Sequence, residues 1–187
     1  MRKQLLSAVA LIALSGTAFA QAPAPPPMQT PNPTYATVVM EIDVNKPAAD
    51  VWKRVGKYCD IAEWFQIAAG CTILSGKDGE FGAVRSVANE ILVGKTELSY
   101  TYTQPVRVGV NYNMYHGTLE ARPVTATTSK IVYTLFFDNS NLPDDAAKDR
   151  DKENRRTRFM QGMRNMKILA EGGTLPPPPP PPARGGR

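Results

Sequence analysis

Residues 82–112 read GAVRSVANEILVGKTELSYTYTQPVRVGVNY, and this stretch decides the fold. Apolar and polar residues alternate in successive runs, a pattern typical of antiparallel strands with one face turned toward a core. The apolar positions here and just beyond are rich in tyrosine and methionine. Tyrosine carries a polar tip and methionine adapts its shape, so both suit a pocket wall better than a tight aliphatic core. The stretch therefore predicts a sheet that holds an apolar or aromatic small molecule.

The sequence on either side extends this sheet and adds helices. Strands are predicted over 37–44, 71–75, 83–93, 96–104, 110–122 and 129–138. Turns are predicted at 76–79, 94–95 and 105–109, and short helices over 48–55 and 60–65. The spacing of Phe159, Met163 and Met166 predicts a long helix over 144–170. This order is typical of an α+β fold, in which a curved antiparallel sheet wraps around the C-terminal helix and leaves a cavity between them.

The first twenty residues match a secretion signal. Arg2 and Lys3 precede an apolar run over 5–14, and Ala18-Phe19-Ala20 fits the small-x-small cleavage pattern. The alternative is a membrane anchor, but the run is shorter than the roughly 20 residues that a bilayer needs. We therefore expect a signal peptide over 1–20, no transmembrane anchor, and a periplasmic or secreted product.

Proline-rich segments flank the expected folded domain, which covers residues 35–172. Residues 21–34 are predicted to form an extended linker, and residues 173–187 form a tail that contains the unbroken run Pro176–Pro182. A semi-rigid spacer is the simpler interpretation of the tail. The alternative is that the tail docks into an aromatic groove of a protein partner.

Composition excludes several classes of function. The formal net charge is +5, but no basic stripe is interleaved with stacking aromatics, so nucleic-acid binding is not indicated. The charges over 148–158 alternate in sign, as on a solvated helix face. With a single histidine and no Cys-x-x-Cys spacing, the sequence predicts no metal site and no cofactor. It also lacks the Gly-x-Ser-x-Gly elbow of many hydrolases.

The chain contains two cysteines, Cys59 and Cys71. An even count in an exported protein favours one disulfide between them. The alternative is two separate buried thiols.

The chain resembles the START/Bet v 1-like superfamily, also called the polyketide cyclase/dehydrase and lipid-transport group, over most of 37–170. The residues that carry the resemblance are Pro47-x-x-x-Val51-Trp52, Glu63-Trp64, Gly82-x-Val84-Arg85, Glu90-x-Leu92 and Asn111-Tyr112. The resemblance implies a helix-grip fold and a hydrophobic ligand. Plant abscisic-acid receptors share the last three of these motifs, which implies that Glu90 and Tyr112 face the pocket. The gate loop and the latch of those receptors are missing here, which argues against a hormone-type switch.

We expect ten residues to line the ligand pocket: Trp64, Arg85, Glu90, Tyr100, Tyr102, Tyr112, Met114, His116, Phe159 and Met163. His116 shares the strand parity of Tyr112 and Met114, so it could point inward and act as a general base, or simply be a hydrogen-bonded structural residue. Arg85 and Glu90 are placed on one strand, either paired inside or facing solvent. Trp64 lies either at the cavity mouth or in the core.

Three functions are compatible with this sequence. The first is binding or transport of a hydrophobic or aromatic small molecule, favoured because no catalytic cluster is visible. The second is a polyketide cyclase or dehydratase, with His116, Glu90 or Arg85 acting on a carbonyl compound. The third is an accessory protein that acts through protein partners, using the proline-rich tail or the charged helix.

Overall fold

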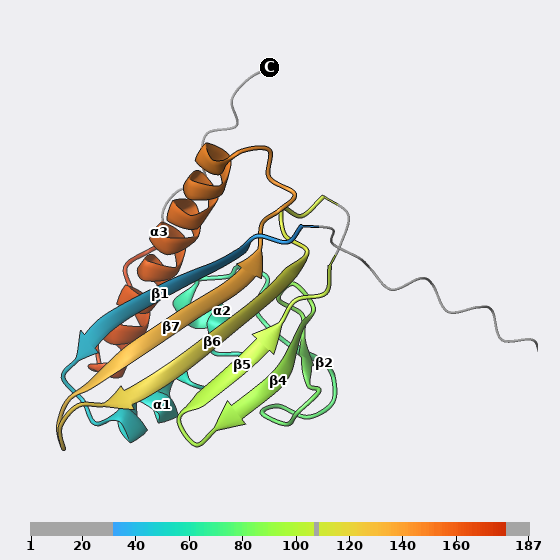
Figure 1. Ribbon diagram of the computed structural model, residues 1–187. Coiled ribbons are helices and arrows are strands. Elements are labelled where there is room, and N and C mark those ends of the chain that lie inside the picture. The colour runs from blue at the N-terminus through green and yellow to red at the C-terminus, as the bar shows by residue number, and fades with distance from the viewer. Residues whose placement is uncertain (1–31, 107–108, 179–187) are drawn as a thin grey trace, which may run out of the picture.

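The computed structural model describes residues 32–106 and 109–178 (Figure 1). The predicted signal peptide, most of the predicted linker and the end of the proline-rich tail lie outside these residues. Among the residues that are described, no helix combines the length and the apolar character needed to cross a membrane.

Within these described residues, seven antiparallel strands form one sheet in the order β1-β7-β6-β5-β4-β3-β2. The strands are β1 (Tyr35–Val44), β2 (Ile73–Ser75), β3 (Val84–Arg85), β4 (Glu90–Thr96), β5 (Ser99–Thr103), β6 (Met114–Pro123) and β7 (Ser129–Asp138). The helices are α1 (Ala48–Val55), α2 (Ile61–Trp64) and α3 (Asp145–Ala170). Figure 1 shows the helices on one side of a curved sheet, with α3 running alongside β1. The predicted α+β helix-grip fold is therefore confirmed.

The second half of α3 carries its apolar contacts with the core. Its buried apolar residues, Phe159, Met163, Met166 and Leu169, recur at helical spacing, whereas the first half is mostly charged. The helix begins after Asp144, whose side chain accepts a hydrogen bond from the amide of Ala147 at 2.7 Å. The C-terminal half of α3 thus closes the core, whereas its N-terminal half meets the rest of the domain through charged side chains such as Asp151 and Arg155.

The prediction of a single strand over 83–93 is wrong. The chain reverses between β3 and β4, and Ala88 and Asn89 both adopt left-handed backbone conformations there, with φ of 52° and 54°. Asn tolerates this conformation, but Ala gives no such signal, so the sequence alone does not mark the turn. The predicted turn at 94–95 is also wrong, because Gly94 and Lys95 belong to β4, where the register with β5 shifts between Leu92 and Gly94.

The predicted disulfide between Cys59 and Cys71 is confirmed, with the two Cα atoms 5.3 Å apart. The disulfide joins the residues just before α2 to the segment that leads into β2. It therefore closes a loop that contains α2. The alternative of two separate thiols is excluded.

Both ends of the described chain contact the domain. The amide of Thr34 donates to the carboxylate of Asp138 at 2.8 Å. At the other end, Leu175 packs against the core and the Gln66 side chain donates to the carbonyl of Pro176 at 2.6 Å. The segment before β1 and the segment after α3 are therefore both held against the domain.

Candidate functional site

A cavity of about 900 Å³ lies between the sheet and the middle of α3. Its walls come from α2 and the loop after it, the turn between β3 and β4, the inner face of β4 and β5, and the segment that precedes β6. Its apolar lining includes Ile61, Phe65, Ile67, Val87, Val110, Tyr115 and Phe159. Its polar lining includes Glu90, Gln104, Asn111, Asp151, Arg155 and Arg158.

A row of three hydrogen-bonded side chains crosses one wall of this cavity. The Tyr112 hydroxyl donates to Gln104 Oε1, and Gln104 Nε2 donates to Glu90 Oε1 at 2.6 Å. All three residues line the cavity. Because each side chain holds the next, the row offers a ligand polar groups in fixed positions.

Arg85 supports this row from behind. Its side chain is fully buried, and its Nε donates to Glu90 Oε2 at 2.6 Å. Its guanidinium carbon lies 4.2 to 5.7 Å from the ring centres of Tyr58, Tyr100 and Tyr102. Such stacking is favourable for a desolvated arginine.

The register of the sheet corrects one prediction about this pair and decides between two interpretations. Arg85 and Glu90 do not share a strand, because they lie opposite each other on β3 and β4. Both are buried, so the solvent-facing alternative is excluded. Burial raises the pKa of Glu90, while the Arg85 guanidinium and the Gln104 amide oppose this shift.

The α3 wall carries a second polar group of residues. Arg155 Nε donates to Asp151 Oδ2 at 2.7 Å, and Arg155 Nη2 donates to Asn111 Oδ1 at 3.1 Å. Its guanidinium carbon also lies 4.4 to 5.5 Å from the ring centres of Tyr112, Tyr115 and Phe137. Burial raises the pKa of Tyr115 to about 12, although Arg155 opposes the shift, so this tyrosine stays neutral at physiological pH.

The ten predicted pocket residues fall into three groups. Glu90, Tyr102, Tyr112 and Phe159 line the cavity. Arg85, Tyr100, Trp64 and Met163 are buried outside its lining, so Trp64 belongs to the core rather than to the cavity mouth. The third group, Met114 and His116, does not line the cavity either.

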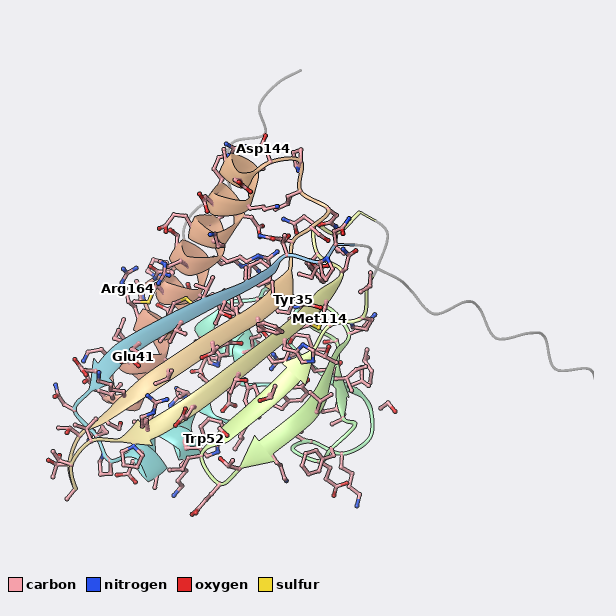
Figure 2. All side chains as sticks on the ribbon, in the orientation of Figure 1. Tyr35, Glu41, Trp52, Met114, Asp144 and Arg164 are labelled. Atoms are coloured by element: carbon pink, nitrogen blue, oxygen red, sulfur yellow. A yellow bond between two sulfur atoms is a disulfide. The ribbon has the colours of Figure 1, made fainter. Side chains whose placement is uncertain are left out.

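The prediction that Met114 and His116 point inward is wrong. It assumed one strand from residue 110 onward, on which they would share a face with Tyr112. Instead β6 begins at Met114, which Figure 2 labels, and the buried residues of β6 alternate from Tyr115. His116 lies opposite Thr103 and Phe136 on the outer face of the sheet. The structure therefore removes His116 as a general base for this cavity.

Sequence reasoning missed Gln104, Asn111, Tyr115 and Arg155. Gln104 follows Tyr100 and Tyr102 at even spacing, and Arg155 precedes Phe159 by one helical turn, so parity and helical spacing could have found both. Among residues 32–106 and 109–178, no three His, Cys, Asp or Glu side chains group in a way that could hold a metal ion.

A family model described as polyketide cyclase/dehydrase and lipid transport matches residues 35–171. No curated protein matches the chain. The solved structures that share the fold include the following three, each at low sequence identity. A solution structure from Thermobifida fusca is 22% identical, with a TM-score of 0.61, and the alignment covers 74% of this chain and 97% of that one. Truncated norcoclaurine synthase from Thalictrum flavum is 12% identical (TM-score 0.58; 79% and 100% covered). The Zhui aromatase/cyclase from Streptomyces sp. R1128 is 16% identical (TM-score 0.54; 75% and 100% covered).

Proposed function

The chain belongs to the polyketide cyclase/dehydrase and lipid transport family, and from this we propose that it binds a hydrophobic or aromatic small molecule between the sheet and α3. The observation that carries the proposal is the Glu90–Gln104–Tyr112 row on one wall of a cavity whose other walls combine apolar side chains with the polar group on α3. Apolar walls with a few fixed polar groups are the usual design of small-molecule sites.

The geometry of the row indicates what kind of ligand suits it. Glu90 is a buried acceptor, and burial of a charged group is tolerated only when hydrogen bonds satisfy it. A hydroxyl group at one end of an aromatic ligand could donate to Glu90, while its rings lie against Phe65 and Phe159, whose centres are 5.2 Å apart. We therefore favour a ligand with one polar end and a ring system or chain behind it.

Export of this binding protein is part of the proposal. The signal pattern over 1–20 supports it, and so does the disulfide, because disulfides persist mainly in oxidising compartments. In that setting the protein would carry its ligand through the periplasm or outside the cell.

Replacement of Tyr112 by Ala tests the binding function. We expect Tyr112→Ala to change the affinity for a neutral apolar probe, N-phenyl-1-naphthylamine, several-fold while lowering Tm by only a few degrees. The reason is that Tyr112 lines the cavity, so the space that its ring leaves joins the cavity and can be filled by the probe or by water. Fluorescence titration and thermal melts of the same preparation measure both quantities.

The matched control is Tyr35→Ala, because Tyr35 is 61% exposed and lies on the outer face of the sheet. This variant should bind the probe as the wild type does. If the wild type binds no probe and Tyr112→Ala costs several kcal/mol, as the loss of a core residue does, the binding proposal fails. An accessory role through protein partners would then lead.

A cyclase-type enzyme remains the second candidate, and one observation favours it. Glu90 is a buried carboxyl group whose pKa is raised by burial, and it faces the cavity, as a general acid or base would. Such an enzyme should lose turnover of a carbonyl substrate in Glu90→Gln while still binding the probe. His116→Ala should leave turnover unchanged, because His116 lies outside the cavity. Equal turnover in wild type and Glu90→Gln would remove this candidate.

A further inference from the structure

A second cavity, of about 470 Å³, opens on the same inner face of the sheet. It is formed by the end of α1, the turn at 78–79, and the hairpin of β4 and β5. Figure 2 labels Trp52 in this region, where α1 approaches the hairpin. Tyr58 and Tyr100 line this cavity, whereas Glu90 and Tyr102 line the main one. Arg85 contacts all four residues, so it lies between the two cavities.

Aromatic side chains form one wall of the second cavity. The Trp52 indole folds back over Gly56, since a Cβ atom at Gly56 would lie only 2.4 Å from Trp52 Cδ2. The Trp52 and Tyr100 rings are 5.7 Å apart, and Tyr58 meets Tyr100 edge to face at 5.3 Å. With Leu92 beside them, these mutually inclined rings form an apolar wall against which the edge or face of an aromatic ligand can pack.

The charges in the lining favour an anion. The lining contains three positively charged and two negatively charged side chains: Lys53, Lys57 and Lys95, and Asp78 and Glu97. Lys95 Nζ is engaged by the carbonyl of Gly79 at 2.6 Å. Lys53, in the last turn of α1, and Lys57, two residues beyond the end of that helix, make no ion pair with any residue that the structure describes. A carboxylate beside them would gain two charge contacts.

Tyr58, which also lines the second cavity, carries a hydroxyl that can donate a hydrogen bond. Tyr58 is 2% exposed, and its hydroxyl is buried with no hydrogen-bond partner among the described residues. A buried hydroxyl without a partner is costly, so a ligand that accepts a hydrogen bond from it would gain affinity. Burial raises the pKa of Tyr58, which keeps this hydroxyl protonated and able to donate.

From these observations we propose that the second cavity binds a small aromatic carboxylate. The ring of the ligand lies against Trp52 and Tyr100, and its carboxylate faces Lys53 and Lys57. This site is separate from the main cavity, so its ligand need not be the ligand proposed above.

The test uses three probes with one ring system and different charges: 2-naphthoate, 2-naphthylmethanol and 2-naphthylmethylamine. Titrations of the mature, disulfide-bonded protein would be followed by calorimetry and by amide NMR shifts. We expect 2-naphthoate to bind most tightly and to shift the amides of residues 53–58 and 97–100. Lys53→Gln/Lys57→Gln should weaken 2-naphthoate about fivefold to tenfold and leave 2-naphthylmethanol unchanged. Trp52→Leu should weaken both probes.

The matched control is Lys148→Gln/Lys152→Gln, which removes the same charge from α3 and should leave the affinity for 2-naphthoate unchanged. Tyr112→Ala, in the main cavity, should also leave it unchanged, so failure of the main site does not affect this result. The proposal is overturned if the amine or the alcohol binds as tightly as 2-naphthoate. It is also overturned if both lysine double variants behave alike, or if the shifts map only to Gln104, Tyr112 and their neighbours.

Discussion

At the scale of single residues, Asp138 shows how one carboxylate joins three segments of the chain. It accepts hydrogen bonds from the amide of Thr34 at 2.8 Å, from the Asn113 side chain at 3.0 Å and from the amide of Ser140 at 3.1 Å. Burial alone would raise the pKa of Asp138, but these hydrogen bonds outweigh it and hold the pKa below the ordinary value of 3.8.

This arrangement makes part of the stability depend on pH. Because the folded-state pKa of Asp138 is lowered, its contribution is present above pH 3.8 and is lost as the pH falls through the folded-state value. We therefore expect the wild type to lose more stability than Asp138→Asn between pH 7 and about pH 2. Urea melts at several pH values measure the difference. Asp145→Asn, at an exposed position on α3, is the control, and it should follow the wild type.

The contact between Gly117 and Tyr102 could not be predicted from the sequence. Gly117 lies opposite Tyr102 on the neighbouring strand, and a Cβ atom there would be 2.4 Å from the Tyr102 ring. Tyr102 is thereby seated in the space above Gly117 and hydrogen-bonded to the Tyr133 hydroxyl at 3.0 Å. The sequence identifies Tyr102 as an inward residue, but nothing in it pairs this tyrosine with a glycine fifteen positions away.

At the scale of secondary structure, α3 protects the edge of the sheet. β1 is an edge strand, and such strands expose unpaired carbonyl groups that invite association. Arg156 donates to the carbonyl of Val39 at 3.1 Å, and Lys167 donates to the carbonyl of Asp43 at 2.6 Å. Side chains of α3 therefore occupy two carbonyl groups of β1.

Removal of these two side chains should expose the edge. We expect Arg156→Ala/Lys167→Ala to change Tm little, because both contacts are exposed, but to raise the rate of association at high protein concentration. Light scattering during incubation near 40 °C measures that rate. The control, Lys152→Ala/Arg164→Ala, removes the same charges from α3 without touching β1, and comparable association in both variants would contradict the capping role.

Elements with strong periodicity were predictable, and elements set by turns were not. The limits of β7 and α1 match the sequence prediction, and α3 begins one residue later than expected. The hairpin between β3 and β4 was missed because Ser86–Asn89 contains no glycine or proline. An irregular segment was also missed before β6, which was predicted to start at residue 110 and begins at Met114. This error placed His116 and Met114 on the wrong face of the sheet, because a shift of one residue reverses the direction of every side chain in a strand.

At the scale of the whole molecule, the first residues after α3 complete the fold. Gly172 ends the helix with φ of 89°, after which Leu175 packs on the core and Pro176 accepts a hydrogen bond from Gln66. Gln66 lies two residues after α2, so the chain returns from the end of α3 to the start of the loop that lines the main cavity.

Two truncated proteins should show which part of the tail contributes to thermal stability. Ending the chain after Gly173 removes the contacts of Leu175 and Pro176, at a cost of about 1 kcal/mol, or about 4 °C in Tm. Ending it after Pro178 keeps both contacts and should leave Tm unchanged. Thermal melts of the two truncated proteins decide the point, and an equal Tm for both would show that Leu175 contributes nothing.

The position of Arg85 affects how a ligand can enter and leave the main cavity. Its ion pair with Glu90 and its three stacked tyrosines close the main cavity at the end nearest the second one. The proposed ligand is therefore not expected to pass from the main cavity into the second one. A bound ligand must then dissociate before another can bind. The rate of exchange equals the dissociation rate, and a higher concentration of competing ligand does not increase it.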